Sequence, residues 1–141
     1  MNFSFTVFGI PVPQGSSRAF IPKGWTRPII TAANSKTKPW RQEVAGACLA
    51  RLGGQCPAAS HVPVRVEVKF FFDRPKSLKK SVCDKVTKPD LDKLARSILD
   101  ALTGIAFGDD SQVTDLRVTK AFGSPARAEI QISEGMQCKT P

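Results

Sequence analysis

The stretch VPVRVEVKFFF, residues 62–72, is the clearest β-strand in the sequence. Apolar and charged side chains alternate along it, so one face can be buried while the other meets solvent. The buried face would carry Val64, Val66, Val68 and Phe70. The opposite face would carry Arg65, Glu67 and Lys69. This alternation predicts a sheet with one face packed against a second layer.

Before and after this strand in the sequence, apolar residues recur every three or four positions, which is the spacing of an amphipathic helix. Upstream, residues 35–54 predict a helix that Ser35 or Thr37 caps and that Gly53-Gly54 ends. Its apolar stripe consists of Trp40, Val44, Cys48 and Leu52. Downstream, a second helix starts at Asp90 and is closed by Gly104. Its stripe consists of Leu91, Leu94, Ala95, Ile98, Leu99 and Leu102.

Three more strands are expected near the two ends of the chain. Residues 3–10 open with alternating apolar and polar side chains, and residues 113–122 and 126–133 alternate as well. Gly123-Ser124-Pro125 between the last two predicts a hairpin. The order strand, helix, strand, helix, strand, strand predicts an α+β fold, a two-layer sandwich in which helices pack on one face of a mixed β-sheet.

The remaining segments are expected to be loops within a single domain, residues 1–141. Residues 9–28 contain Gly and Pro at close intervals, which predicts a long irregular loop. Residues 105–107 are expected to be short and extended, and residues 108–112 to form a turn. From about residue 134 the chain is expected to be a loose tail. The sequence contains neither a membrane span nor a secretory signal, so we expect an intracellular, cytoplasmic protein.

The charge distribution points to a polyanionic partner. The net charge is +9, and residues 1–42 contain six basic side chains and no acid. Residues 74–88 add six basic side chains against Asp84 alone. A basic surface of this kind is typical of nucleic-acid binding. Four cysteines without a CxxC pair, and a single histidine, argue against a zinc site.

The acidic side chains concentrate instead in KPDLDKLARSILDALTGIAFGDDSQV, residues 88–113. One interpretation is structural. Asp90 follows a proline and can cap a helix, while Asp92, Arg96 and Asp100 are spaced to form a salt-bridge ladder. An Asp-Asp pair in a Gly-containing turn is also common.

The alternative interpretation is a metal site. Asp90 lies outside the helix, so its carboxylate can turn beside that of Asp92, and the turn with Asp109 and Asp110 could close onto the same helix end. Converging carboxylates without His or Cys suit Mg²⁺, with Mn²⁺ as a substitute. In this interpretation Asp109 and Asp115 are either supporting residues or purely structural, and Asp100 pairs with Arg96 or with a neighbouring strand.

The stretch 88–113 resembles the signature of the RusA-type Holliday junction resolvase family of bacteria and their phages and prophages. The matching features are a D-x-D, a helix with DAL, a short apolar return and a D-D-x-Q-V turn. A weaker likeness extends to DLRVTK and to FTVFGIPVPQGSSR. The resemblance implies a homodimeric Mg²⁺-dependent endonuclease that nicks four-way DNA junctions in recombination and repair.

Carried over by this resemblance, the metal ligands and catalytic aspartates are Asp90, Asp92 and Asp110. The family's catalytic lysine falls on Arg96, a departure, because arginine can stabilise charge but does not readily transfer a proton. Lys93 stands where many members carry Asn and would share this role.

DNA contacts are expected from the two basic segments and the helix start, at Arg18, Lys23, Arg27, Lys79, Lys80, Lys85, Lys88 and Lys93. Two other functions stay open: a non-catalytic nucleic-acid-binding module and a less selective phage nuclease for branched DNA.

Overall fold

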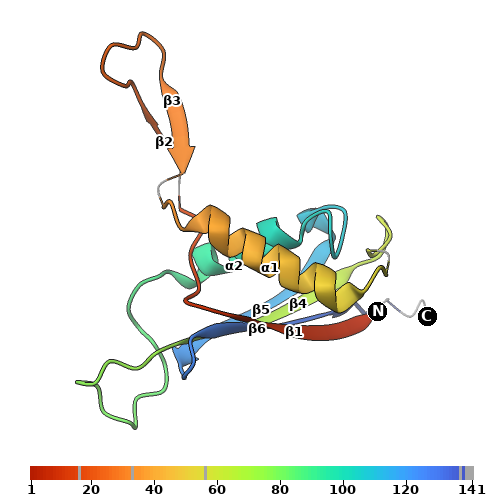
Figure 1. Cartoon of the computed structure of the whole chain (residues 1–141). Coiled ribbons are helices and arrows are strands. Elements are labelled where there is room, and N and C mark those ends of the chain that lie inside the picture. Colours follow the sequence, from red (N-terminus) through yellow and green to blue (C-terminus); the bar gives the residue numbers. More distant parts are fainter. Residues whose placement is uncertain (16, 33, 56, 137, 139–141) are drawn as a thin grey trace.

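The structure, a computed structural model, describes residues 1–15, 17–32, 34–55, 57–136 and 138, with the backbone alone for 17–19 and 30–32. Two helices cover one face of a four-stranded sheet, and a two-stranded sheet stands apart (Figure 1). The elements are β1 (Asn2–Phe8), β2 (Ser17–Phe20), β3 (Ile29–Ala32), α1 (Thr37–Leu52), β4 (Val64–Phe72), α2 (Leu91–Leu102), the 3₁₀ helix η1 (Asp110–Gln112), β5 (Val113–Phe122) and β6 (Arg127–Glu134). The predicted α+β fold is confirmed.

The larger sheet is built around β4, in the order β1-β6-β4-β5. β4 pairs with β6 in antiparallel fashion and with β5 in parallel fashion. Its predicted inner face is confirmed, since these four side chains are at most 1% exposed: Val64, Val66, Val68 and Phe70. The sheet is therefore mixed, as the sequence predicts.

The α2 stripe is confirmed at Leu94, Ala95, Ile98 and Leu102, whereas Leu91 and Leu99 are only partly buried. The α1 stripe is confirmed, but the predicted capping of α1 is not. Its stripe is buried, and Gly53 ends it with a left-handed φ of 57°. The N-cap residue is Lys36, and it makes no side-chain capping bond. The Thr37 hydroxyl instead donates to the carbonyl of Pro13 at 2.9 Å. This contact fastens the segment before β2 to the start of α1.

The predicted hairpin at residues 123–125 is wrong, because β5 and β6 lie on opposite sides of β4. The connection crosses the end of β4, where the amide of Gly123 donates to the carbonyl of Phe72 at 2.9 Å. Alternation identifies each strand but carries no information about its partner. The residues Gly123-Ser124-Pro125 are compatible both with a tight hairpin and with the observed connection across the end of β4.

The predicted loop 9–28 contains a strand, which is a second correction. β2 pairs with β3 from Ser17↔Ala32 to Phe20↔Ile29. The resulting hairpin projects away from the two layers beside the start of α1 (Figure 1). Its strands are short, and the Gly and Pro residues around them hide the alternation on which strand prediction depends.

Residues 103–107, which include the predicted extended segment, form a compact turn. The amide of Gly104 donates to the carbonyl of Phe107 at 2.7 Å, and Ala106 and Phe107 are fully buried. The chain therefore does not run back along α2 before β5 begins. The predicted tail begins as a continuation of β6 up to Glu134, and residues 137 and 139–141 lie outside the described part.

Gly123→Ala should destabilise the fold. A Cβ at this position would lie 2.7 Å from Cδ1 of Phe71, a contact that requires the ring or the backbone to move. We expect a loss of about 1–3 kcal/mol in the free energy of unfolding, measured by urea denaturation. Gly46→Ala in α1 is the matched control, because a Cβ there meets no atom within 4 Å. The control should gain up to about 1 kcal/mol from helix propensity. Equal stability of the two variants would refute the proposed crowding.

Candidate active site

An open cleft of about 590 Å³ lies between α2 and β5. Its floor is apolar and its rim carries charged side chains. The floor residues are Leu91, Ala95, Leu99, Leu116 and Val118. The rim residues are Asp92, Arg96, Asp100 and Asp110. The cleft thus contains two of the three aspartates that the resemblance assigned to the metal, together with Arg96.

The helical repeat explains why three charged side chains of α2 lie on the same rim of the cleft. Asp92, Arg96 and Asp100 are four residues apart, so they project from one side of the helix, toward β5. Asp100 is also within 3.8 Å of the Arg41 guanidinium of α1. The expected pairing of Asp100 with Arg96 or a strand is therefore wrong. The i, i+4, i+8 spacing was the signal that Asp100 belongs to the same rim as Asp92.

A buried glutamine fixes the turn that carries Asp110. The side chain of Gln112 accepts from the amides of Gly108 at 2.9 Å and Asp109 at 3.2 Å. It also donates to the carbonyl of Ala59 at 2.8 Å. These bonds anchor the turn to the loop that follows α1. Because the glutamine is only 8% exposed, breaking them leaves buried polar groups unpaired.

The two adjacent aspartates of this turn have different roles. Asp109 caps η1 by accepting from the amide of Ser111 at 3.0 Å, and that bond is the main reason why its pKa is lowered. A hydrogen bond shared with the Asp109 carboxyl raises the pKa of Asp110, and burial and the charges of Asp109 and Asp100 add to this. Asp110 is the member that lines the cleft, while Asp109 is structural.

Asp90 lies outside this cleft. It is the N-cap residue of α2 with an extended backbone, as predicted, but its side chain makes no capping hydrogen bond. Its carboxylate faces Lys88 at 3.8 Å and Lys93 at 3.9 Å. All three line a neighbouring hollow of about 430 Å³. The capping interpretation therefore does not account for this side chain.

The predicted convergence of Asp90, Asp92 and Asp110 is not observed. Among the described residues, no three His, Cys, Asp or Glu side chains are placed to hold one metal ion together. The compact turn at 103–107 explains the difference, because it keeps Asp110 beside Asp100 in the second half of α2. Asp115, a predicted supporting residue, pairs with Arg65 at 3.2 Å and Arg117 at 3.6 Å. These residues lie on the sheet face opposite the helices.

Lys120 of β5 fixes the backbone directly before Asp90. Its ammonium donates to the carbonyls of Thr87 at 2.7 Å and Pro89 at 2.8 Å. No sequence pattern identifies Lys120 as part of this region, because nothing local indicates that the end of β5 meets the start of α2. The contact holds the basic connector, residues 73–89, against the sheet.

The predicted DNA-binding residues lie in different surroundings. Lys23 and Arg27 are exposed on the hairpin, Lys79 and Lys80 on the connector, and the Arg18 side chain lies outside the described part. The Lys85 ammonium instead lies over the rings of Phe72 and Phe122, at 5.3 and 5.6 Å. Burial and the charge of Lys120 lower the pKa of Lys85, so packing accounts for this side chain.

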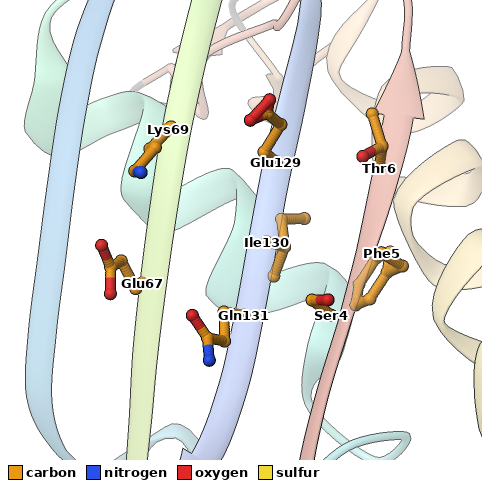
Figure 2. A pocket seen from close by; sticks show the side chains of 8 residues that line it. All are labelled: Ser4, Phe5, Thr6, Glu67, Lys69, Glu129, Ile130 and Gln131. Atoms are coloured by element: carbon orange, nitrogen blue, oxygen red, sulfur yellow. The ribbon is translucent and has the colours of Figure 1, made fainter.

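A second hollow lies on the open face of the sheet, on the side away from the helices (Figure 2). It measures about 350 Å³ and mixes charges of both signs, from Glu67, Lys69 and Glu129. It contains none of the predicted site residues. Such a solvated, polar face is ordinary for an antiparallel pairing covered on one side.

The chain belongs to a family of endodeoxyribonucleases. A family model described as endodeoxyribonuclease RusA matches residues 10–133, which confirms the resemblance. "Uncharacterized protein YqaN" of Bacillus subtilis (strain 168) is 34% identical over 140 residues, covering 92% of this chain and 94% of the relative. "Crossover junction endodeoxyribonuclease rusA" of Lactococcus phage r1t is 35% identical over 75 residues, covering 52% and 56%. Across the described ranges, no helix is both long and apolar enough to cross a bilayer.

Lys120→Met should loosen the connector. The substitution leaves the carbonyls of Thr87 and Pro89 to water, so we expect a loss of about 1 kcal/mol in the free energy of unfolding. Hydrogen exchange at residues 84–90 should become faster. Lys69→Met on the open sheet face is the control and should change neither measurement. Unchanged exchange in Lys120→Met would mean that other contacts hold the connector.

Asp109→Asn should lower the pKa of Asp110. The substitution removes the negative charge that repels an ionised Asp110, and the new amide NH₂ can donate a hydrogen bond to that carboxylate. Carboxyl ¹³C NMR titration of the metal-free protein measures this directly. Asp100→Asn should give a smaller decrease, because only the charge of Asp100 acts on Asp110. Asp115→Asn should leave the titration of Asp110 unchanged.

Proposed function

We propose that this protein is a Mg²⁺-dependent, structure-specific endodeoxyribonuclease that resolves four-way DNA junctions by paired nicks. The observation that carries the proposal is the placement of Asp92, Asp110 and Arg96 around one cleft in a chain of the endodeoxyribonuclease RusA family. The printed name of the phage relative, a crossover junction endodeoxyribonuclease, supports the same substrate. Recombination and repair of DNA are the processes in which such junctions arise.

The donor atoms of the site fit magnesium. Carboxylate oxygens are hard ligands, and Mg²⁺ usually keeps several waters and takes one or two carboxylates besides substrate phosphate. Asp92 and Asp110 are both exposed at the rim but lie toward opposite ends of α2, so in the two-fold dimer proposed below Asp92 of one protomer, with Asp90 next to it, would share the ion with Asp110 of the other. When bound, the ion lowers the pKa of a coordinated water and polarises the scissile phosphate. Mn²⁺ offers the same coordination.

Asp90 can turn toward Asp92 at little cost. Its ion pairs with Lys88 and Lys93 are long and partly exposed, at 3.8 and 3.9 Å. Each such pair contributes less than about 1 kcal/mol. An approaching phosphate would compete for the two lysines and release the carboxylate.

Arg96 would neutralise the charge that develops on the non-bridging phosphate oxygens. Its guanidinium lies on the same rim as Asp92 and Asp110 and is exposed to solvent. Because arginine stays protonated, it can orient and stabilise the phosphate but does not act as the base. Water activation therefore falls to the carboxylates and the ion that they hold.

We further propose a two-fold homodimer, because a four-way junction must be cut on two opposing strands. The floor of the cleft and the edge strand β5 support this arrangement, since Leu116 is 42% exposed there. A two-fold axis across α2 would bring the Asp92 end of one helix to the Asp110 end of the other. Sedimentation should then give twice the chain mass.

A nucleic-acid-binding module without catalysis is the second candidate. The observation in its favour is that Asp90, Asp92 and Asp110 are not gathered into one group within the described part of the chain. It predicts that binding of DNA survives every aspartate substitution and that no Mg²⁺-dependent cutting occurs.

The proposal predicts symmetric nicking of a labelled four-way junction in Mg²⁺ by the wild type. Asp92→Asn and Asp110→Asn should each reduce cleavage by about 100-fold or more, because the lost ligand stabilises transition-state charge by several kcal/mol. Junction binding should persist in both variants. Asp115→Asn is the matched control, since its carboxylate pairs with arginines on the far sheet face.

Two outcomes would change the conclusion. Equal cutting of junctions, flaps and linear duplex would make the protein a less selective nuclease. Junction binding without cutting in Mg²⁺ or Mn²⁺ would favour the binding module.

A further inference from the structure

The hairpin of β2, β3 and their loop, residues 17–32, is here called the arm. Figure 1 shows that it stands off from both layers of the domain. Ile21 and Trp25 near its tip are 61% and 59% exposed. Large apolar side chains are normally buried, and two within five residues at a projecting tip indicate a contact surface.

A hydrogen-bonded turn holds the tryptophan at the tip. The amide of Trp25 donates to the carbonyl of Pro22 at 2.9 Å. Gly24, at the third position of this turn, has a φ of +85°, which a type II turn requires and glycine adopts without strain. Trp25 is therefore presented by a defined turn, and less ordering is needed when it binds.

The arm rises beside the Asp90 end of the candidate active site. The hollow that contains Asp90 is also lined by Gly15 and Asn34, the residues that flank the arm on its two sides. Lys88 and Lys93 complete the same hollow. A nucleic-acid strand that reaches Asp90 therefore passes the base of the arm.

The length and charge of the arm suit insertion into DNA. A four-residue strand is about 13 Å long, which exceeds the roughly 8.5 Å depth of the major groove. Lys23 and Arg27 are exposed near the tip, and the arm contains no acidic residue. Its basic side chains can approach phosphates while the apolar tip reaches the bases.

We propose that the arm tip recognises the branch point of a DNA junction, with Trp25 stacked on an unstacked base and Ile21 beside it. This inference rests on the proposed function and names the element that distinguishes branched from linear DNA. Inserting a side chain into a linear duplex requires unstacking, which costs a few kcal/mol per step, whereas in the open form of a four-way junction, which prevails without divalent cations, the bases at the branch point have already lost a stacking neighbour. Branch selectivity then resides in the arm, and phosphate hydrolysis in the cleft.

The test measures binding in EDTA, so that cleavage plays no part. Wild type, Trp25→Ala, Trp25→Phe and Ile21→Ala are titrated against a labelled four-way junction and a linear duplex of the same sequence. Trp25→Ala should weaken junction binding by about 5- to 100-fold, the range for loss of one base–aromatic stack. Duplex binding should change by less than about twofold, because phosphate contacts supply it. Trp25→Phe should keep most of the junction affinity.

A matched control and a fluorescence measurement complete the test. Leu49 on α1 is 57% exposed and outside the arm, so Leu49→Ala removes a comparable apolar side chain and should bind both DNAs as the wild type does. Trp25 emission, taken as the difference between wild type and Trp25→Phe, should be quenched by the junction. Trp40, which is 5% exposed, contributes equally to both proteins.

Three results would overturn the inference. These are equal affinity losses for junction and duplex, no loss for either, and quenching of Trp25 by anionic lipid vesicles but not by the junction. Cleavage assays separate this inference from the proposed function. If the wild type cuts the junction and Trp25→Ala cuts it with the same preference over duplex, the role of the arm is refuted and the proposed function is not. Selective junction binding through Trp25 without any cutting in Mg²⁺ refutes the proposed function alone.

Discussion

The pairing of β4 with strands on both sides determines where everything else in this molecule lies. Its inner face is almost completely excluded from water, from Val64 to Phe70. Its parallel pairing with β5 requires the chain to return through a crossover, and α2 supplies it. The helix consequently runs opposite to β4 and β5. Its first turn lies at the far end of β5 and its last turn near the beginning of β5. Asp92 and Asp110 therefore line opposite ends of the cleft.

The elements of the fold could be predicted because alternation and helical stripes report burial locally. The partners of the strands could not be predicted. β6 follows β5 in the sequence but pairs with β4 and not with β5, and no local pattern indicates that pairing. For the same reason, the sequence predicted that Asp90, Asp92 and Asp110 converge, whereas the structure places Asp110 beside Asp100. The position of Asp110 depends on a buried turn around Phe107, and Lys120 meets Thr87 only after the crossover has formed.

The chain separates its charges according to where they are needed. Acidic side chains are concentrated around α2 and the start of β5, whereas the arm and the connector are basic. The cations nearest the acidic rim are held by weak, partly exposed pairs, such as Arg41 with Asp100 at 3.8 Å. The basic segments attract a polyanion at long range. The weak ion pairs leave the carboxylates free to exchange their cationic partners when the polyanion is bound.

The pairing of the first strand with the last one has a consequence for synthesis on the ribosome. β1 is bound to the sheet through β6, from Asn2↔Ser133 to Phe8↔Arg127, and β6 also joins it to β4. β1 therefore has no strand partner until β6, which follows all the other strands, has emerged from the ribosome. During that time the backbone N–H and C=O groups of β1 lack their ladder partners, and such an unpaired strand exposes the nascent protein to aggregation and chaperone capture. A chain that stops before β6 would lose the strand that joins β1 to β4, and with it the continuity of the sheet.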